Sequence, residues 1–152
     1  MPTSSPVFRD LDFHEIEGML KSNTYGRLAF SFRDRVDIEP IHYVYGDGWL
    51  FCRTAPGTKV TLLTHHPWVA FEIDEVRDLF IWRSVVVKGT VYFVEPDGSG
   101  VLDDAWSNAL RALRSLVPGT LATDDPTPGR NVVFRIHIDE MHGRAAGWPE
   151  GS

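Results

Sequence analysis

The sequence predicts a mainly β fold, an antiparallel barrel of about six strands with three short helices beside it. Two observations favour this fold class. Strand-like runs follow one another through hairpin turns and short connections, which is typical of antiparallel sheets. In addition, residues 79–94 form one long β-branched and aromatic run. A run of this length is unusual in an open sheet but natural in a strand that bends around a barrel, and Gly89 would allow the bend.

The three helices are predicted from capping residues and from the spacing of apolar side chains. Asp12 and Glu15 form a capping box for a helix over residues 12–21. A second, short helix covers residues 57–65. A third spans residues 103–117, where apolar residues recur every three or four positions before a Pro-Gly pair ends the pattern.

Six segments are expected to form strands: residues 24–31, 36–45, 49–53, 68–75, 79–94 and 131–138. Pro40 places its strand at a sheet edge or a bulge, because proline has no N–H for a ladder. We expect residues 1–152 to form a single domain, with loose ends at residues 1–9 and 143–152.

Composition excludes several classes of function. The net charge is −6 and the pI is about 5.4, whereas nucleic-acid-binding domains usually carry a basic surface. The sequence has no apolar run long enough to cross a membrane and no signal-like start. Cys52 is the single cysteine and cannot form an internal disulfide. The histidines are too scattered for a metal site. We therefore expect a cytoplasmic protein without metal, nucleic-acid or membrane partners.

The most informative stretch joins the third strand to the second helix. Arg53 and Thr54 end the strand, Gly57 lies in a turn, and Thr58 and Lys59 open the helix. Two cations, several hydroxyls and the unpaired N–H groups of a helix start are thereby concentrated in one place, which suits a phosphate group. An ordinary strand–turn–helix junction with two solvated cations is the alternative that these residues leave open.

Five segments carry a family resemblance when they are taken in order: Tyr25–Ala29, Glu39–Tyr45, Phe51–Lys59, His66–Asp74 and Trp82–Gly89. In this order and spacing the chain resembles the pyridoxamine 5'-phosphate oxidase-like family, and within it the small single-domain branch that includes nitroimidazole-resistance proteins. The resemblance covers roughly residues 10–95. It implies a six-stranded split β-barrel that forms a homodimer, with FMN in a groove between the subunits.

The resemblance also implies which residues hold the cofactor. Those expected at the FMN phosphate are Arg53, Thr54, Gly57, Thr58 and Lys59. Those expected along the flavin ring and ribityl chain are Trp82, Ser84, Val85, Pro40, Ile41 and His42. His42 is the candidate catalytic residue, and a partly buried histidine bonded within the sheet is the alternative.

The function expected from this resemblance is that of an FMN-dependent oxidoreductase acting on a small planar substrate, with NAD(P)H as the electron donor. Pyridoxamine phosphate itself is not the expected substrate, because the longer family enzymes grip it with a C-terminal segment that has no counterpart here. Two alternatives stay open. One is a non-catalytic module that stores or sequesters its ligand, and the other is the same barrel holding a deazaflavin or haem.

Overall fold

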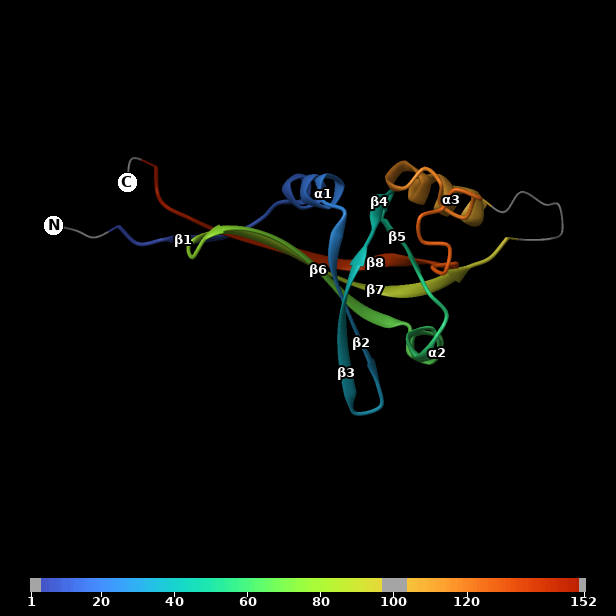
Figure 1. Cartoon of the computed structure of the whole chain (residues 1–152). Coiled ribbons are helices and arrows are strands. Elements are labelled where there is room, and N and C mark those ends of the chain that lie inside the picture. The colour runs from blue at the N-terminus through green and yellow to red at the C-terminus, as the bar shows by residue number, and fades with distance from the viewer. Residues whose placement is uncertain (1–3, 97–103, 151–152) are drawn as a thin grey trace.

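A computed structural model describes residues 4–96 and 104–150, as a curved antiparallel sheet with three helices packed against it (Figure 1). The strands are β1 (Val7–Asp10), β2 (Tyr25–Phe32), β3 (Arg35–His42), β4 (Val44–Gly46), β5 (Trp49–Thr54), β6 (Trp68–Asp78), β7 (Ile81–Val94) and β8 (Val132–Gly147). The helices are α1 (Phe13–Ser22), α2 (Thr58–His65) and α3 (Asp104–Leu116). Within the described ranges, no helix has the length and apolarity needed to cross a bilayer.

The strands form one sheet in the order β3-β2-β6-β7-β8-β5-β4, and β1 pairs separately with β8. Every strand pair is antiparallel. The mainly β fold class is therefore confirmed. Among the described strands, β3 pairs with β2 alone, which confirms the edge position expected from Pro40. All three predicted helices are present; residue 103, the first of the third, lies outside the described residues.

The strand count and the chain ends differ from the prediction. The described residues contain eight strands instead of the six expected. Residues 36–45 divide into β3 and β4, because the Tyr43 side chain is fully buried and its N–H bonds back to Thr24. The ends are also less loose than expected, since β1 pairs with the last residues of β8, from Arg144 to Gly147. Local sequence gave no sign of this pairing, which depends on the tertiary fold.

The far ends of β6, β7, β8 and β1 extend away from the barrel as an arm, made of residues 7–10, 75–83 and 144–148 (Figure 1). The helices α2 and α3 lie at the opposite end of the molecule. This separation decides which predicted site residues can meet within one chain.

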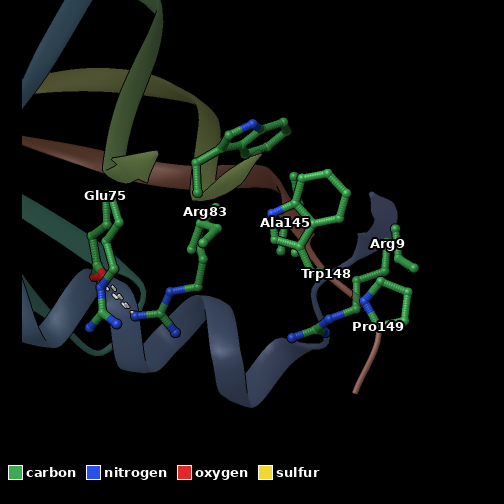
Figure 2. Close-up of a pocket in the computed structure, with 12 residues that line it drawn as sticks. Arg9, Glu75, Arg83, Ala145, Trp148 and Pro149 are labelled. Carbon is green, nitrogen blue, oxygen red and sulfur yellow. Dashed lines mark hydrogen bonds and ion pairs between the residues drawn. The ribbon is translucent and has the colours of Figure 1, made fainter. Parts of the chain in front are cut away.

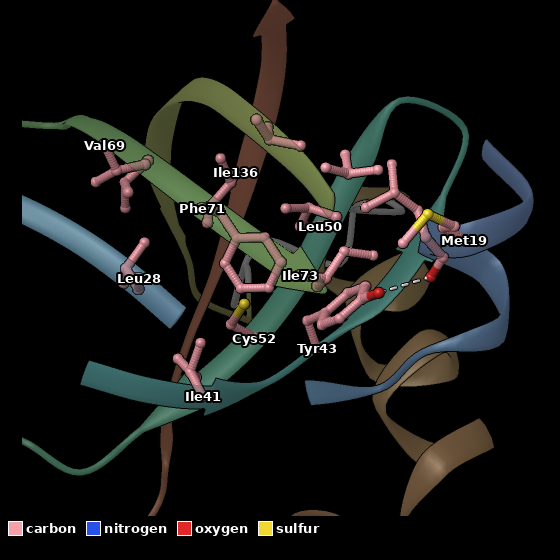
Figure 3. Packing of buried hydrophobic residues seen from close by; sticks show 14 of the residues in the cluster. Met19, Leu28, Ile41, Tyr43, Leu50, Cys52, Val69, Phe71, Ile73 and Ile136 are labelled. Atoms are coloured by element: carbon pink, nitrogen blue, oxygen red, sulfur yellow. Dashed lines mark hydrogen bonds between the residues drawn. The ribbon is translucent and has the colours of Figure 1, made fainter. Parts of the chain in front are cut away.

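The barrel interior is a hydrophobic core with a buried hydrogen bond between Tyr43 and Leu20 beside it (Figure 3). The Tyr43 hydroxyl donates to the carbonyl oxygen of Leu20 in α1 at 2.9 Å, and the Tyr43 ring packs against the edge of Phe71 with centroids 4.9 Å apart. Cys52 is fully buried in this core, and burial raises the pKa of its thiol. The cysteine therefore packs like a small apolar residue rather than acting as a nucleophile.

Gly89 is the position in β7 where a side chain would do most harm. A Cβ atom there would meet the carbonyl oxygen of His137 and lie 2.8 Å from Ile136. Gly89→Ala should therefore lower the free energy of unfolding by about 1–3 kcal/mol, the usual cost of overpacking. Gly18→Ala is the matched control, because Gly18 lies in α1 with open space around it. The control should raise stability by up to about 1 kcal/mol. Urea denaturation of both variants checks this, and equal stabilities would contradict the close approach.

Candidate functional site

The predicted phosphate corner exists as a tight turn followed by an uncapped helix. Gly57 is the N-cap of α2 and has φ 155° and ψ −164°, a conformation essentially restricted to glycine. No side chain caps the first turn of α2. Its N–H groups are therefore available to a bound anion. We call residues 53–60, from Arg53 to Val60, the β5–α2 corner.

Arg53 is not free at this corner. Its guanidinium forms a two-pronged ion pair with Asp125, with nitrogen–oxygen distances of 2.6 and 3.0 Å, and also donates to Thr127 at 2.9 Å. The Arg53 and Asp125 side chains are only 10% and 1% exposed. The hydrogen bond from Arg53 holds the pKa of Asp125 well below its usual range. Arg53 thus anchors the loop after α3, and both of its terminal nitrogens are already occupied.

Lys59 has a carboxylate partner as well, but a more accessible one. Its Nζ lies 2.5 Å from the Glu39 carboxylate, and the two side chains are 18% and 39% exposed. Glu39 lies on β3, so this ion pair ties the start of α2 to the strand that carries Pro40 and His42. This pair is more accessible to solvent than the Arg53–Asp125 pair, so a ligand phosphate could compete with Glu39 for Lys59 more readily than with Asp125 for Arg53.

His42 and Arg53 face one cavity of about 290 Å³. α3 and the loop that follows it form the other wall of this cavity, which also includes Thr24 and Arg130. The His42 ring packs against Tyr25, with centroids 5.5 Å apart. Together with the Lys59–Glu39 pair, this cavity shows that β3 residues 39–42 run alongside the β5–α2 corner. The structure therefore brings together the two groups of site residues predicted at the phosphate and at the ring edge on β3.

Three of the predicted residues point into the barrel instead of toward this corner. Ile41 and Val85 belong to the hydrophobic core, and Thr54 is also buried. The reason is strand alternation, because neighbours in a strand point to opposite faces. The residues next to Ile41 and Val85 in each strand face outward and could contact a cofactor. The side chains of Ile41 and Val85 themselves contact the core.

Trp82 lies in the arm and Ser84 lies directly next to the arm, and both are far from the corner. In the sheet, Arg53 pairs with Val133 and Ser84 pairs with Arg144, both on β8. The eleven residue steps from one partner to the other correspond to about 36 Å of extended strand. The third group of predicted residues therefore does not meet the other two within one chain.

Arg27 connects two acidic residues on the outer face of the sheet, between β3 and β7. Its Nη1 lies 3.0 Å from Glu72 and 3.4 Å from Asp74. Partial burial and the neighbouring Asp74 raise the pKa of Glu72 to about 7, against the opposing effect of Arg27. Neither this network nor the Glu39 and Asp125 partners could be found from the sequence, because each pairing joins residues from distant segments.

This antiparallel fold, closed around a core and split beside the β5–α2 corner, is that of a split-barrel protein. A sequence model of the family described as pyridoxamine 5'-phosphate oxidase matches residues 12–145. The chain belongs to the pyridoxamine 5'-phosphate oxidase family. This confirms the resemblance seen in the sequence.

Individual relatives agree with this assignment. An uncharacterized protein of Rhizobium meliloti is 31% identical over 147 residues, covering 91% of this chain and 95% of its own. The crystal structure of an FAD-binding protein from Mesorhizobium loti has a TM-score of 0.76 and 28% identity, over 93% of this chain and 99% of that one. A structure described as a 5-nitroimidazole antibiotic resistance protein from Bacteroides thetaiotaomicron has a TM-score of 0.65 and 18% identity, over 95% and 90%, and shows the shared fold alone.

The Arg53–Asp125 pair should matter for stability. Asp125→Asn is expected to lower the free energy of unfolding at pH 7 by about 3 kcal/mol, because Arg53 is left buried without its counter-charge. The pKa of Asp125 is lowered in the folded state, so its contribution is complete above the ordinary carboxyl pKa of about 4 and is lost as the pH falls below it.

The difference between wild type and Asp125→Asn should accordingly begin to shrink below about pH 4 and should go on shrinking as the pH falls further. Asp124→Asn, a change of the neighbouring exposed residue, should leave the stability at pH 7 nearly unchanged. Urea denaturation across this pH range is the measurement. An Asp125→Asn variant as stable at pH 7 as the Asp124→Asn variant would show that the ion pair does not stabilise the fold.

Proposed function

We propose that this chain is a flavin-binding oxidoreductase whose cofactor phosphate binds at the β5–α2 corner. The observation that carries the proposal is the corner itself, where an uncapped helix start, a glycine-specific turn and Lys59 lie together beside β3. A phosphate there would accept hydrogen bonds from the N–H groups of the first turn and from the Thr58 hydroxyl, and would gain the charge of Lys59. Arg53 would attract the phosphate through its charge without a direct hydrogen bond, because its terminal nitrogens donate to Asp125.

FMN is the proposed cofactor, and its ring would lie along the outer edge of β3, next to Pro40 and His42. The Mesorhizobium loti protein of similar structure is described as FAD-binding. FAD contains the same flavin and ribityl chain as FMN, but its phosphate belongs to a diphosphate joined to adenosine, whereas FMN presents a terminal phosphate group. A deazaflavin or haem would have a different absorption spectrum, which makes these alternatives easy to distinguish.

The proposed active form is a homodimer in which the arm of one chain completes the site of the other. FMN is much shorter than the strand length that separates Ser84 from the corner of its own chain, so one flavin could touch both groups only across two chains. Exposed apolar side chains on the outer face support an interface, because Val36, Ile38 and Trp68 are 79%, 62% and 69% exposed. Side chains of this kind are commonly covered in an assembly.

The proposed reaction takes electrons from NAD(P)H and passes them to a small planar substrate. The bound flavin would supply the redox chemistry, and the protein would supply binding, orientation and electrostatics. His42 would polarise the substrate at the ring edge, and its position in one cavity with Arg53 supports this role. We assign this activity to the cytoplasm, because cytosolic thiols are kept reduced and Cys52 is a free, buried thiol.

The direct test is the visible spectrum of the purified full-length protein before and after addition of FMN, FAD or a deazaflavin. Bound oxidised flavin followed by bleaching with NADPH would support the oxidoreductase. A flavin that binds without being reduced would instead favour the storage or sequestering alternative. Absence of any flavin binding would contradict the proposal.

Glu39→Gln should strengthen FMN binding by about threefold to tenfold, because the change releases Lys59 from its competing carboxylate. Lys59→Gln should weaken FMN binding by about tenfold. Riboflavin, which lacks the phosphate, should bind both variants as it binds the wild type. Fluorescence titration with the two ligands is the measurement. Equal effects on FMN and riboflavin would show that Lys59 does not act on the phosphate.

Mixed dimers test whether two chains build each site. Lys59→Gln and Trp82→Ala change opposite ends of the proposed site, so each homodimer should bind FMN poorly. A heterodimer of the two variants should regain one intact site, while its other site carries both changes. The measurement is FMN stoichiometry after the two variants are unfolded together and refolded. No recovery of tight binding would contradict a site shared between chains.

A further inference from the structure

Two opposite charges on the outer face of the sheet are poorly balanced within one chain. Glu72 and Asp74 share one arginine, because Arg27 Nη1 lies 3.0 Å from the first carboxylate and 3.4 Å from the second. Burial and the neighbouring Asp74 raise the pKa of Glu72 to about 7 in spite of Arg27, so this carboxylate is short of positive charge. Lys88 on β7 is exposed, and it makes no hydrogen bond or ion pair with any of the described residues.

The arginines of the arm behave differently. A cavity of about 600 Å³ lies at the arm, and Arg9 and Arg83 belong to its lining (Figure 2). Arg9 forms a two-pronged pair with Glu15 at 2.7 and 3.0 Å. Arg83 pairs with Glu75 at 2.7 Å, as Figure 2 shows. These two arginines find their counter-charges inside the chain, so the outer face of β6 and β7 is the better surface for contact with a charged partner.

Lys88 also lines an open cavity of about 310 Å³ on the outer face. Ala29 and Ala70 form part of the floor and pair in register, and Ala70 pairs with Lys88 on its other side. The apolar walls include Trp68 and Val36, whose side chains are 69% and 79% exposed. Lys88 is the one charged residue of the described lining. The small floor residues leave room for a side chain that belongs to another molecule.

The acidic network lies directly beside this cavity and on the same face. Glu72 follows Ala70 by two residues on β6, and it pairs with Arg27, which precedes Ala29 by two residues on β2. Residues two apart on a strand point to the same face and are about 7 Å apart. A cavity with an ammonium group and a carboxylate that needs one therefore lie side by side. A surface that carries a feature and its complement can pair with a second copy of itself across a two-fold axis.

The shared flavin site proposed above places the same axis by a different route. That site requires the corner of one chain, with Arg53, to lie near Ser84 of the other. The midpoint between the β8 partners of Arg53 and Ser84 falls at residues 138–139, beside Lys88 in β7. A two-fold axis that crosses the strands and brings each arm to the other chain's corner must therefore pass near Lys88.

We propose that the outer face of β6 and β7 is the contact between two copies of this chain, and that Lys88 of each copy pairs with the partner's Glu72. With the axis between Ala70 and Glu72, each Glu72 side chain lies over the partner's alanine floor. Sheets packed face to face are about 10 Å apart, a gap that a lysine and a glutamate side chain span together. Trp68 and Val36 would shield the ion pair from water. This contact rests on the homodimer of the proposed function, but its test is made without flavin.

The test measures the dissociation of dimers of the flavin-free full-length protein by analytical ultracentrifugation. Lys88→Glu and Glu72→Lys each place like charges in both contacts of a homodimer, so each change should weaken the dimer by at least about tenfold. A mixture of the two variants should regain the wild-type affinity, because their heterodimer has opposite charges in both contacts. Arg111→Glu, the same change of charge at an exposed residue of α3, should dimerise as the wild type does.

Circular dichroism shows whether each variant is folded. Lys88→Glu breaks no contact with the described residues, so its fold should be unchanged. Glu72→Lys loses the pair with Arg27, and Glu72→Gln takes its place if that variant does not fold. A mixture of Lys88→Glu with Glu72→Gln has one opposite pair and no like pair, so it should still dimerise more tightly than Lys88→Glu alone.

Three results would overturn the proposal. Lys88→Glu dimers as tight as those of Arg111→Glu would show that another face joins the chains, although the homodimer of the proposed function would stand. Folded variants whose mixture stays monomeric would show that the two positions do not meet across the axis. A monomeric wild type would contradict this contact and the proposed homodimer together. In contrast, a dimer restored by mixing that binds no flavin would support the contact and contradict the proposed function alone.

Discussion

The antiparallel pairing of β7 with β8 is the constraint on which the rest of the structure depends. These strands have 14 and 16 residues and pair along almost their whole length. One end of β8 also pairs with β5, the strand that leads into the corner. The other end pairs with β1 in the arm. A ladder of this length fixes the face of every side chain along it, which puts Val85 in the core and Ser84 outside.

The charges at the corner explain how the chain folds before any anion binds. Arg53 and Lys59 each have a carboxylate partner within the chain, but the two pairs differ in exposure. The Arg53–Asp125 pair is almost fully buried, so opening it would leave a charge without solvent or partner. The Lys59–Glu39 pair is partly solvated and therefore opens at a lower cost than the Arg53–Asp125 pair. This difference makes Lys59, and not Arg53, the direct phosphate ligand in the proposed complex.

Much of the fold could be predicted from the sequence because its signals are local. The capping box at Asp12, the turn at Gly57 and the apolar run of β7 each act over a few residues. The last residues of β8 and all of β1 gave no such signal, because only their pairing with each other and with β7 makes them strands. For the site, the sequence located the corner and β3. It could not find Asp125 or Glu39, since a carboxylate partner 72 or 20 positions away has no periodic pattern.

A crystal structure of the protein with FMN is the measurement that tests the central claim most directly. The account predicts that the phosphate lies within hydrogen-bond distance of Lys59 Nζ and of the first N–H groups of α2, with Asp125 still bound to Arg53. It also predicts that the flavin ring lies between β3 of one chain and the arm of another. A phosphate bound away from α2, or a flavin enclosed by a single chain, would contradict the account.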